Sequence, residues 1–205
     1  MRIVDLTHEF NENMPVYPGD SHPHLSRIAE IHKEGFTDHE LKTAMHVGTH
    51  MDAPLHMIDG GKYLSEIPVE KFLGKGHLID ARGHDSISEK LLQGLDIEKG
   101  IILVIFTGHS AHYREDSYYA KFPMLTEAFA QRAVAMGISM ICLDTPSPDA
   151  PPFPVHKILL GHEVLIVENL TNLESLLNVK NFKIIALPFK LHSDAAATRV
   201  IALTE

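Results

Sequence analysis

The chain has 205 residues, of which 44 % are hydrophobic and 22 % charged, and its net charge is −9. This length fits one domain, and the composition excludes a disordered, collagen-like or coiled-coil chain. The acidic balance without a basic run argues against nucleic acid or an anionic membrane as a partner, and no apolar run approaches the roughly 18 residues of a membrane span.

The first half of the chain carries weak helix signals, and we expect mostly β structure packed on the second half. Strands are predicted at 3–6 and 37–47, with a turn-rich stretch at 11–20 between them. Asp5 and His8 fall where a signal peptide carries its apolar segment, so a cytoplasmic location is expected.

The second half alternates apolar strands with helices. The predicted strands are 76–80, 101–106, 138–143, 164–167 and 182–187. The predicted helices are 86–93, 125–136, 155–160 and 171–178, and the first and last begin with capping-box spacing. This order predicts one α/β domain over 1–205, with a mixed, partly parallel sheet and flanking helices.

Histidine is unusually frequent, with 15 copies and no tryptophan in the chain, and it is the commonest metal ligand. His46, His50, Asp52 and His56 occupy even positions of the segment 46–56, so an extended strand would place them on one face. A helix would pair the same residues at i,i+4, but a glycine and a proline inside the segment argue against it.

Strand geometry limits which of these side chains can reach one cation. Neighbours at i,i+2 lie about 6.7 Å apart, so His50 and Asp52 can lean onto one ion. His46 joins them only if the chain bends, most cheaply at Gly48, or if two ions bind. Imidazole and carboxylate ligands without sulfur suit zinc, manganese or iron.

A second candidate pair lies downstream, where a short helix carries His156 and the following strand ends at Glu168. A helix that turns back onto its own strand could bring the two side chains together, and His162 and Glu163 at the intervening turn are alternatives. Nucleophilic catalysis is poorly supported, because Ser110 lacks a nucleophile elbow and Cys142, the only cysteine, lies in an apolar run.

The segment 46–56 resembles the signature of the cyclase family of metal-dependent hydrolases, whose best-known members are bacterial kynurenine formamidases. It matches the family pattern His-x-Gly-Thr-His-x-Asp-x-Pro-x-His at every fixed position. The stretches 5–8 with 14–20, and 155–157 through 167–170, resemble other parts of the family pattern.

The resemblance implies five metal ligands, which are His46, His50, Asp52, His156 and Glu168. It further implies zinc as one or two ions, with manganese as an alternative, and His56 as the catalytic acid/base. The implied fold is a swivelling β/β/α domain, and the implied assembly is a homodimer or homotetramer.

The implied function is amide hydrolysis by metal-bound hydroxide, with N-formylkynurenine, from tryptophan catabolism, as the leading substrate. Tyr17 or Phe36 would stack on its aromatic ring. Tyr17 stands where kynurenine formamidases have tryptophan, and the stretches 193–199 and 108–113 also depart from their pattern. The alternatives are hydrolysis of a cyclic amide such as isatin, a metal-dependent cyclase or lyase, and a metal-binding protein without catalysis.

Overall fold

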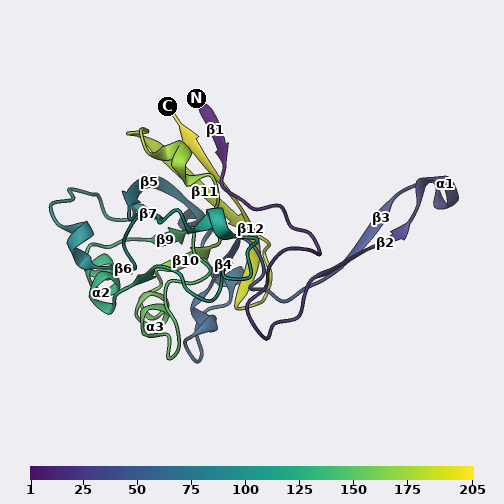
Figure 1. Cartoon of the computed structure of the whole chain (residues 1–205), viewed down its shortest axis with the longest axis horizontal. Coiled ribbons are helices and arrows are strands. Elements are labelled where there is room, and N and C mark those ends of the chain that lie inside the picture. Colours follow the sequence, from purple (N-terminus) through teal and green to yellow (C-terminus); the bar gives the residue numbers. More distant parts are fainter.

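The computed structural model describes all 205 residues, and its centre is a curved sheet that closes on itself (Figure 1). The strands of this sheet are β1 (Arg2–Asp5), β4 (His50–Asp52), β5 (Leu73–Asp80), β7 (Ile102–Phe106), β9 (Met140–Leu143), β10 (Leu165–Glu168), β11 (Phe182–Pro188) and β12 (Ala195–Thr204). They follow the order β1-β12-β11-β5-β7-β9-β10-β4, and an additional pairing of β12 with β4 closes seven of them into a barrel.

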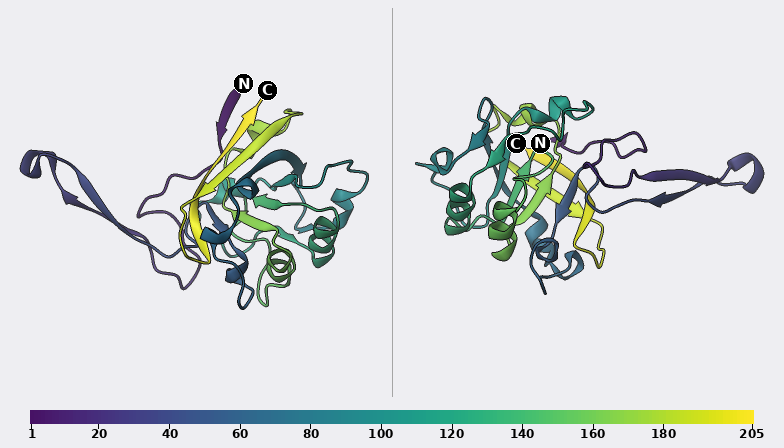
Figure 2. Two further views of the ribbon diagram at one scale, coloured as in Figure 1. Left: turned by 180° about the vertical axis from the view of Figure 1, so that it is seen from behind. Right: turned by 60° about the horizontal axis from the view of Figure 1, so that its bottom comes forward.

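The middle of the sheet is parallel, because β5, β7, β9 and β10 are joined by connections that cross its outer face. The helices α2 (Glu127–Ala135) and α3 (Pro154–Gly161) lie together against that face (Figure 2). With both faces covered, β7 and β9 are entirely buried, as expected of parallel strands. The predicted α/β fold with a mixed sheet and flanking helices is confirmed.

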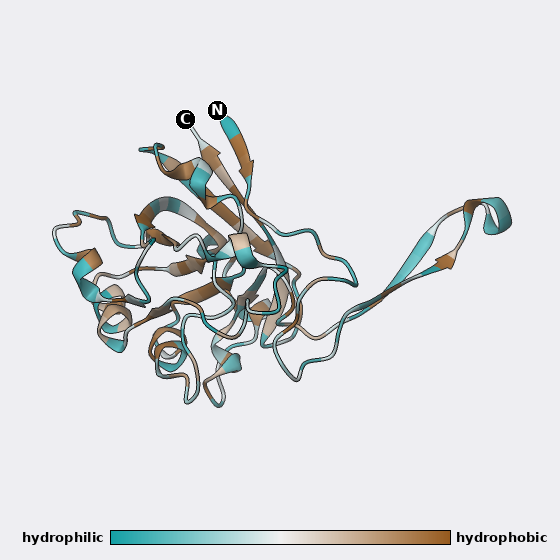
Figure 3. Ribbon diagram, in the orientation of Figure 1, coloured by the Kyte–Doolittle hydropathy of each residue, from teal (hydrophilic) through white to brown (hydrophobic).

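Successive residues of β7 point to opposite faces of the sheet and therefore belong to two different cores. Ile102 and Val104 pack inside the barrel, with residues of β4, β11 and β12. Leu103 and Ile105 pack outside it, against α2 and α3. In Figure 3 the strands of the barrel are coloured largely as hydrophobic, because they supply side chains to both cores.

Two predicted helices are wrong. The stretch 86–93 forms β6 (Ser86–Ile87), paired with β8 (Met124–Leu125), followed by the 3₁₀ turn η4 (Glu89–Leu92). The stretch 171–178 forms only the 3₁₀ turn η6 (Leu173–Leu176), and its N-cap is Asn172 with a φ of 58° rather than Thr171. The remaining 3₁₀ turns are η1 (Pro54–His56), η2 (Leu64–Glu66), η3 (Val69–Phe72) and η5 (His109–His112).

No strand is predicted beyond 187, yet β12 is the longest strand of the molecule, with 10 residues. It pairs with β1, β11 and β4, and so it closes the barrel. Three alanines at its start and Arg199 in its middle hide the apolar alternation that would have marked it.

The first half is not uniformly packed on the second, which corrects another expectation. Residues 24–42 form an arm that projects away from the barrel and consists of β2 (His24–Ala29), α1 (Ile31–Glu34) and β3 (Asp38–Lys42) (Figures 1 and 2). The predicted strand at 37–47 therefore ends at Lys42, because the partner strand β2 begins at His24. None of the helices is long and apolar enough to cross a membrane, and the cytoplasmic location stays a prediction.

Candidate metal centre

Two antiparallel strands, β4 and β10, bring together the candidate ligands His50, Asp52 and Glu168. The register of β4 with β10 places His50 opposite Glu168 and Asp52 opposite Ile166. His50 and Asp52 share one face of β4, as the alternation of side chains requires. His50 Nε2 lies 3.4 Å from Asp52 Oδ1 and 3.3 Å from Glu168 Oε2.

His46 reaches the same place because the chain bends at Gly48, where the sequence analysis places the cheapest bend. Gly48 has a φ of 68°, and a Cβ at this position would collide with the Met14 side chain. His46 Nδ1 lies 3.0 Å from Asp52 Oδ1. The shared strand face predicted for 46–56 is thus limited to 50–52, because His56 lies in the turn η1.

His156 comes from α3, which turns back onto β10. Its Nε2 lies 3.3 Å from Glu168 Oε1 and 3.8 Å from Asp52 Oδ2. The two alternative residues lie elsewhere, since His162 Nδ1 donates to the Ile158 carbonyl and Glu163 forms surface ion pairs with two lysines. The structure therefore gathers all five residues of the predicted ligand set around Asp52.

Each of the three candidate imidazole ligands has its other ring nitrogen held by an acceptor. The acceptors are Asp194 for His46 (2.9 Å), the Gly48 carbonyl for His50 (2.8 Å) and Asp149 for His156 (2.5 Å). Acceptors of this kind fix the tautomer of metal-binding histidines and leave the second nitrogen free for the ion.

Neither Asp149 nor Asp194 is predicted from the sequence, because the signals that mark them are weak. Asp149 precedes α3 by a few residues, within a proline-rich stretch, and it also accepts the backbone N–H of Val155. Asp194 lies directly before β12, a strand that the sequence analysis did not predict.

In the metal-free protein the histidines and carboxylates of the cluster are held in their charged forms by one another. Burial opposes charge on His46, but Asp52 and Asp194 outweigh it and raise its pKa to about 10. Burial likewise opposes charge on His156, but Asp149 and Glu168 raise its pKa to about 10. The pKa of Asp52 is lowered in spite of its burial, chiefly by His46.

The donor atoms themselves fit a metal ion. Asp52 Oδ1 and Oδ2 and His50 Nε2 are buried and make no well-formed hydrogen bond, and their polar neighbours are the other imidazoles and carboxylates of the cluster. Buried polar atoms without a partner are costly, and a bound cation would satisfy them. The acceptors on the three imidazoles leave the remaining nitrogens facing the same carboxylates, so the set suits a divalent ion held by nitrogen and oxygen.

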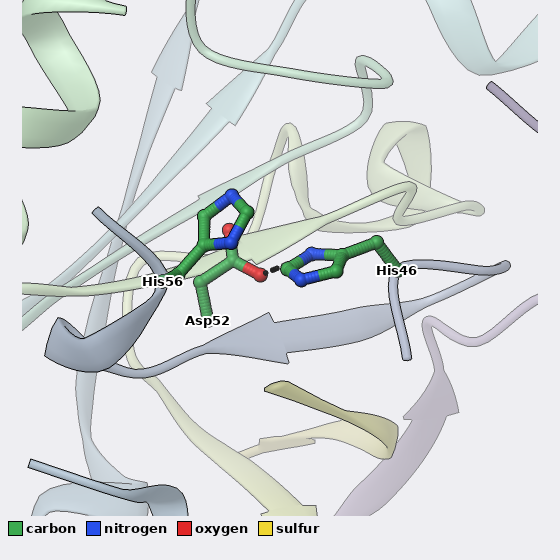
Figure 4. A group of neighbouring side chains, drawn as sticks. All are labelled: His46, Asp52 and His56. Carbon is green, nitrogen blue, oxygen red and sulfur yellow. Dashed lines mark ion pairs between the residues drawn. The ribbon is translucent and has the colours of Figure 1, made fainter. Parts of the chain in front are cut away.

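The donors divide into two groups that share Asp52. One group is His50, Asp52 and Glu168, and the other is His46, Asp52 and His56, which Figure 4 shows. A shared carboxylate suits two ions bridged by one residue. The second group also contains His56, which the sequence analysis expects only as an acid/base.

His56 differs from the other three histidines in its surroundings. Its ring lies 4.0 Å from that of His46, and its Nδ1 is 3.4 Å from Asp194 Oδ2, the oxygen that already bonds to His46. Burial lowers the pKa of His56, so it is neutral at neutral pH. A neutral imidazole beside a metal-binding cluster can accept a proton.

A pocket of about 250 Å³ opens onto the cluster, with His46, His56, His156 and Glu168 in its wall. Tyr17 forms another part of the wall and makes an edge-to-face contact with Tyr119, with 5.7 Å between ring centroids. Phe36, the alternative aromatic residue, lies instead on the exposed arm.

A larger cavity of about 830 Å³ lies beside both termini. Its wall contains one histidine and no group of donors close enough to hold an ion. The smaller pocket is therefore the candidate substrate site.

Comparison with known proteins agrees with this geometry. A family model described as "Putative cyclase" matches residues 4–150. A kynurenine formamidase of Bacillus cereus is 28 % identical over 205 residues, an alignment that covers 98 % of this chain and 95 % of that protein.

Two solved structures resemble the whole chain. A structure described as a potential metal-dependent hydrolase with cyclase activity superimposes with a TM-score of 0.82 at 28 % identity and covers 100 % of this chain and 98 % of that one. Isatin hydrolase A from Labrenzia aggregata, solved with benzyl benzoate, has a TM-score of 0.89 at 25 % identity, with 100 % and 94 % covered.

Proposed function

The chain belongs to the cyclase family, and from that premise we propose that it is an arylformamidase that hydrolyses the formamide bond of N-formylkynurenine. At the coarser level it is a metal-dependent amide hydrolase, acting on a carbon–nitrogen bond. The observation that carries the proposal is the buried cluster around Asp52 at the base of an aromatic pocket.

The residues that would hold the metal are His46, His50, Asp52, His156 and Glu168. We propose zinc, as one or two ions with Asp52 shared, and manganese is the alternative with the same type of ligand. A divalent cation bound there lowers the pKa of a water molecule and polarises an amide carbonyl.

His56 is the residue that moves the proton. Its Nδ1 faces Asp194, so Nε2 is the nitrogen left to exchange a proton with water or substrate in the pocket. Its lowered pKa keeps the ring neutral before the reaction, and Asp194 beside Nδ1 favours the tautomer that leaves Nε2 unprotonated. His56 then accepts a proton from the attacking water and returns it to the nitrogen of the departing aryl amine.

The pocket wall suits an aryl substrate that carries an ammonium group. Tyr17 and Tyr119 offer two ring faces for stacking. Asp20 lies in the same wall, and no lysine or arginine does. N-Formylkynurenine carries an ammonium group that Asp20 could pair with, and its carboxylate would lie away from Asp20, whereas isatin has neither charge.

The deciding experiment compares two substrates on the zinc-loaded protein. We expect kcat/KM for N-formylkynurenine to exceed that for isatin at least about tenfold, the ratio that corresponds to roughly 1.4 kcal/mol. Higher kcat/KM for isatin would replace the proposal with hydrolysis of a cyclic amide, which the similarity to isatin hydrolase A favours. Absence of hydrolysis of either substrate would favour a cyclase, a lyase or a metal-binding protein without catalysis.

The control variant is His56→Ala, with metal content measured in parallel. Loss of activity with unchanged metal content supports the proton-transfer role. Loss of metal would instead assign His56 to the second donor group.

We also propose that the chain forms a homodimer or a homotetramer through its arm. Large apolar side chains of the arm are exposed, namely Ile28 (58 %), Ile31 (60 %), Phe36 (56 %) and Leu41 (44 %). Exposed apolar patches of this kind mark interaction surfaces. Light scattering of the wild type and of an Ile31→Ser, Phe36→Ser double variant tests this, and a monomeric wild type would contradict it.

A further inference from the structure

The histidine-rich loop 107–123, which follows β7, has no part in the proposed reaction, but it is connected to the metal centre by hydrogen bonds through Tyr118 and Asn169. His109 in this loop is buried, and its Nε2 donates a hydrogen bond to the Tyr118 carbonyl at 2.9 Å. The two rings stack with 4.8 Å between centroids. His109 therefore holds Tyr118 in place, and its bonded nitrogen is not available as a metal ligand.

Tyr118 passes this support on to Asn169. Its side chain is fully buried, and its hydroxyl donates a hydrogen bond to Asn169 Oδ1 at 2.8 Å. With Oδ1 occupied as an acceptor, the amide of Asn169 presents Nδ2 to the Gly48 carbonyl at 3.1 Å. The same carbonyl accepts the hydrogen bond from His50 Nδ1 at 2.8 Å.

Asn169 is itself fixed from several directions. It directly follows Glu168 and has a φ of 56°, a left-handed conformation that asparagine tolerates. Its backbone N–H donates to the Thr145 carbonyl at 3.0 Å, and its carbonyl accepts from Thr49 Oγ1 at 2.6 Å. It therefore joins the segment that carries His50 to the strand that carries Glu168.

We propose that Tyr118 and Asn169 are positioning residues for the metal centre. They hold the Gly48 carbonyl where it fixes the Nδ1–H tautomer of His50, so that Nε2 is directed at the ion. An amide is required at 169, because its side chain must accept from Tyr118 and donate to Gly48 at once. The inference rests on the proposed metal-dependent function.

The test measures metal affinity in three variants of the full chain. Tyr118→Phe removes the hydroxyl alone. Asn169→Gly removes the side chain without opposing the left-handed backbone. Tyr113→Phe is the matched control, because the Tyr113 hydroxyl lies in the same loop, is buried and has no hydrogen-bond partner.

Metal-free protein is titrated with Co²⁺, followed by its visible absorption spectrum, and Zn²⁺ affinity is measured by competition with a chelator. We expect Asn169→Gly to weaken both affinities by about 10- to 100-fold. Tyr118→Phe should weaken them about twofold to tenfold, the effect of one hydrogen bond. Both should alter the Co²⁺ spectrum, and Tyr113→Phe should match the wild type.

A purely structural role predicts a different result. In that case Tyr118→Phe and Asn169→Gly lower the melting temperature of the metal-free protein but keep the wild-type affinity and spectrum, which overturns the inference. If Asn169→Gly does not fold, Tyr118→Phe decides, since it removes one oxygen. If the wild type binds neither Co²⁺ nor Zn²⁺, the proposed metal-dependent function fails as well.

Discussion

Replacing Asp149 with asparagine should weaken metal binding while the volume of the side chain stays the same. Asp149 Oδ1 accepts from His156 Nδ1 at 2.5 Å, and Oδ2 accepts the backbone N–H of Val155 at 2.6 Å. In the variant one of these oxygens becomes an NH₂ group. The Val155 N–H keeps its acceptor only if that NH₂ faces His156, whose Nδ1 must then accept a hydrogen bond. The imidazole proton moves to Nε2, the nitrogen that faces Glu168 and Asp52.

The size of the effect follows from the burial of the pair. Asp149 is 5 % exposed and His156 is 3 % exposed, so water cannot replace the lost acceptor. Loss of an orienting partner of this kind costs about 10- to 100-fold in metal affinity, which is about 1.4 to 2.7 kcal/mol at 1.36 kcal/mol per tenfold. Because the variant also favours the wrong tautomer, we expect the upper end of this range.

The assay is Zn²⁺ affinity by chelator competition at neutral pH. Asp96→Asn is the control, because it makes the same chemical change in the distant cavity beside the termini. Wild-type affinity in Asp149→Asn would refute the assignment of His156 Nε2 as a ligand atom. Equal weakening in both variants would point to a general loss of negative charge.

Three further predictions follow from the same cluster and its pocket. Asp52→Ala should abolish metal binding, measured as metal content after dialysis, because both donor groups share Asp52. The control His162→Ala should retain metal. Retention of metal by Asp52→Ala would contradict the shared site. In the metal-free protein the pKa of His46 and of His156 is about 10, above the unfolded value of about 6.5. Their ion pairs therefore stabilise the fold fully below about pH 6.5 and are lost as pH rises towards 10. The melting temperature of the metal-free protein should fall across that window, and an increase would be inconsistent with protonated histidines. Tyr17→Ala should lower kcat/KM for N-formylkynurenine by about twofold to tenfold, the equivalent of roughly 0.5–1.5 kcal/mol for an aromatic pair; unchanged kcat/KM with a lower melting temperature would make Tyr17 a structural residue.

The sequence by itself determined the parts of this protein that depend on short-range patterns. The apolar, β-branched run at 101–106 corresponds to β7, and 138–143 to β9, because buried parallel strands need apolar side chains on both faces. The even spacing of His50 and Asp52 placed both on one face of a strand, and Gly48 marked the bend that lets His46 join them. The family resemblance identified His156 and Glu168 as ligands, because residue spacing alone did not distinguish them from His162 and Glu163.

Only the tertiary structure decided how the barrel closes and what supports the metal-binding histidines. The strand β12 has weak apolar alternation, and its partners β1 and β4 come from the opposite end of the chain, which a local pattern cannot reveal. Within 24–42 the sequence predicts only the strand that begins near 37, which corresponds to β3. Its partner β2 and the projection of the pair as an arm are decided by the tertiary structure. Asp149, Asn169 and Asp194 are common polar residues in loops and at strand ends. Their roles come from hydrogen bonds to side chains or carbonyls, and for Asn169 and Asp194 these partners are more than 100 positions away in the chain. The orientation of a buried imidazole depends on contacts that only the folded chain creates.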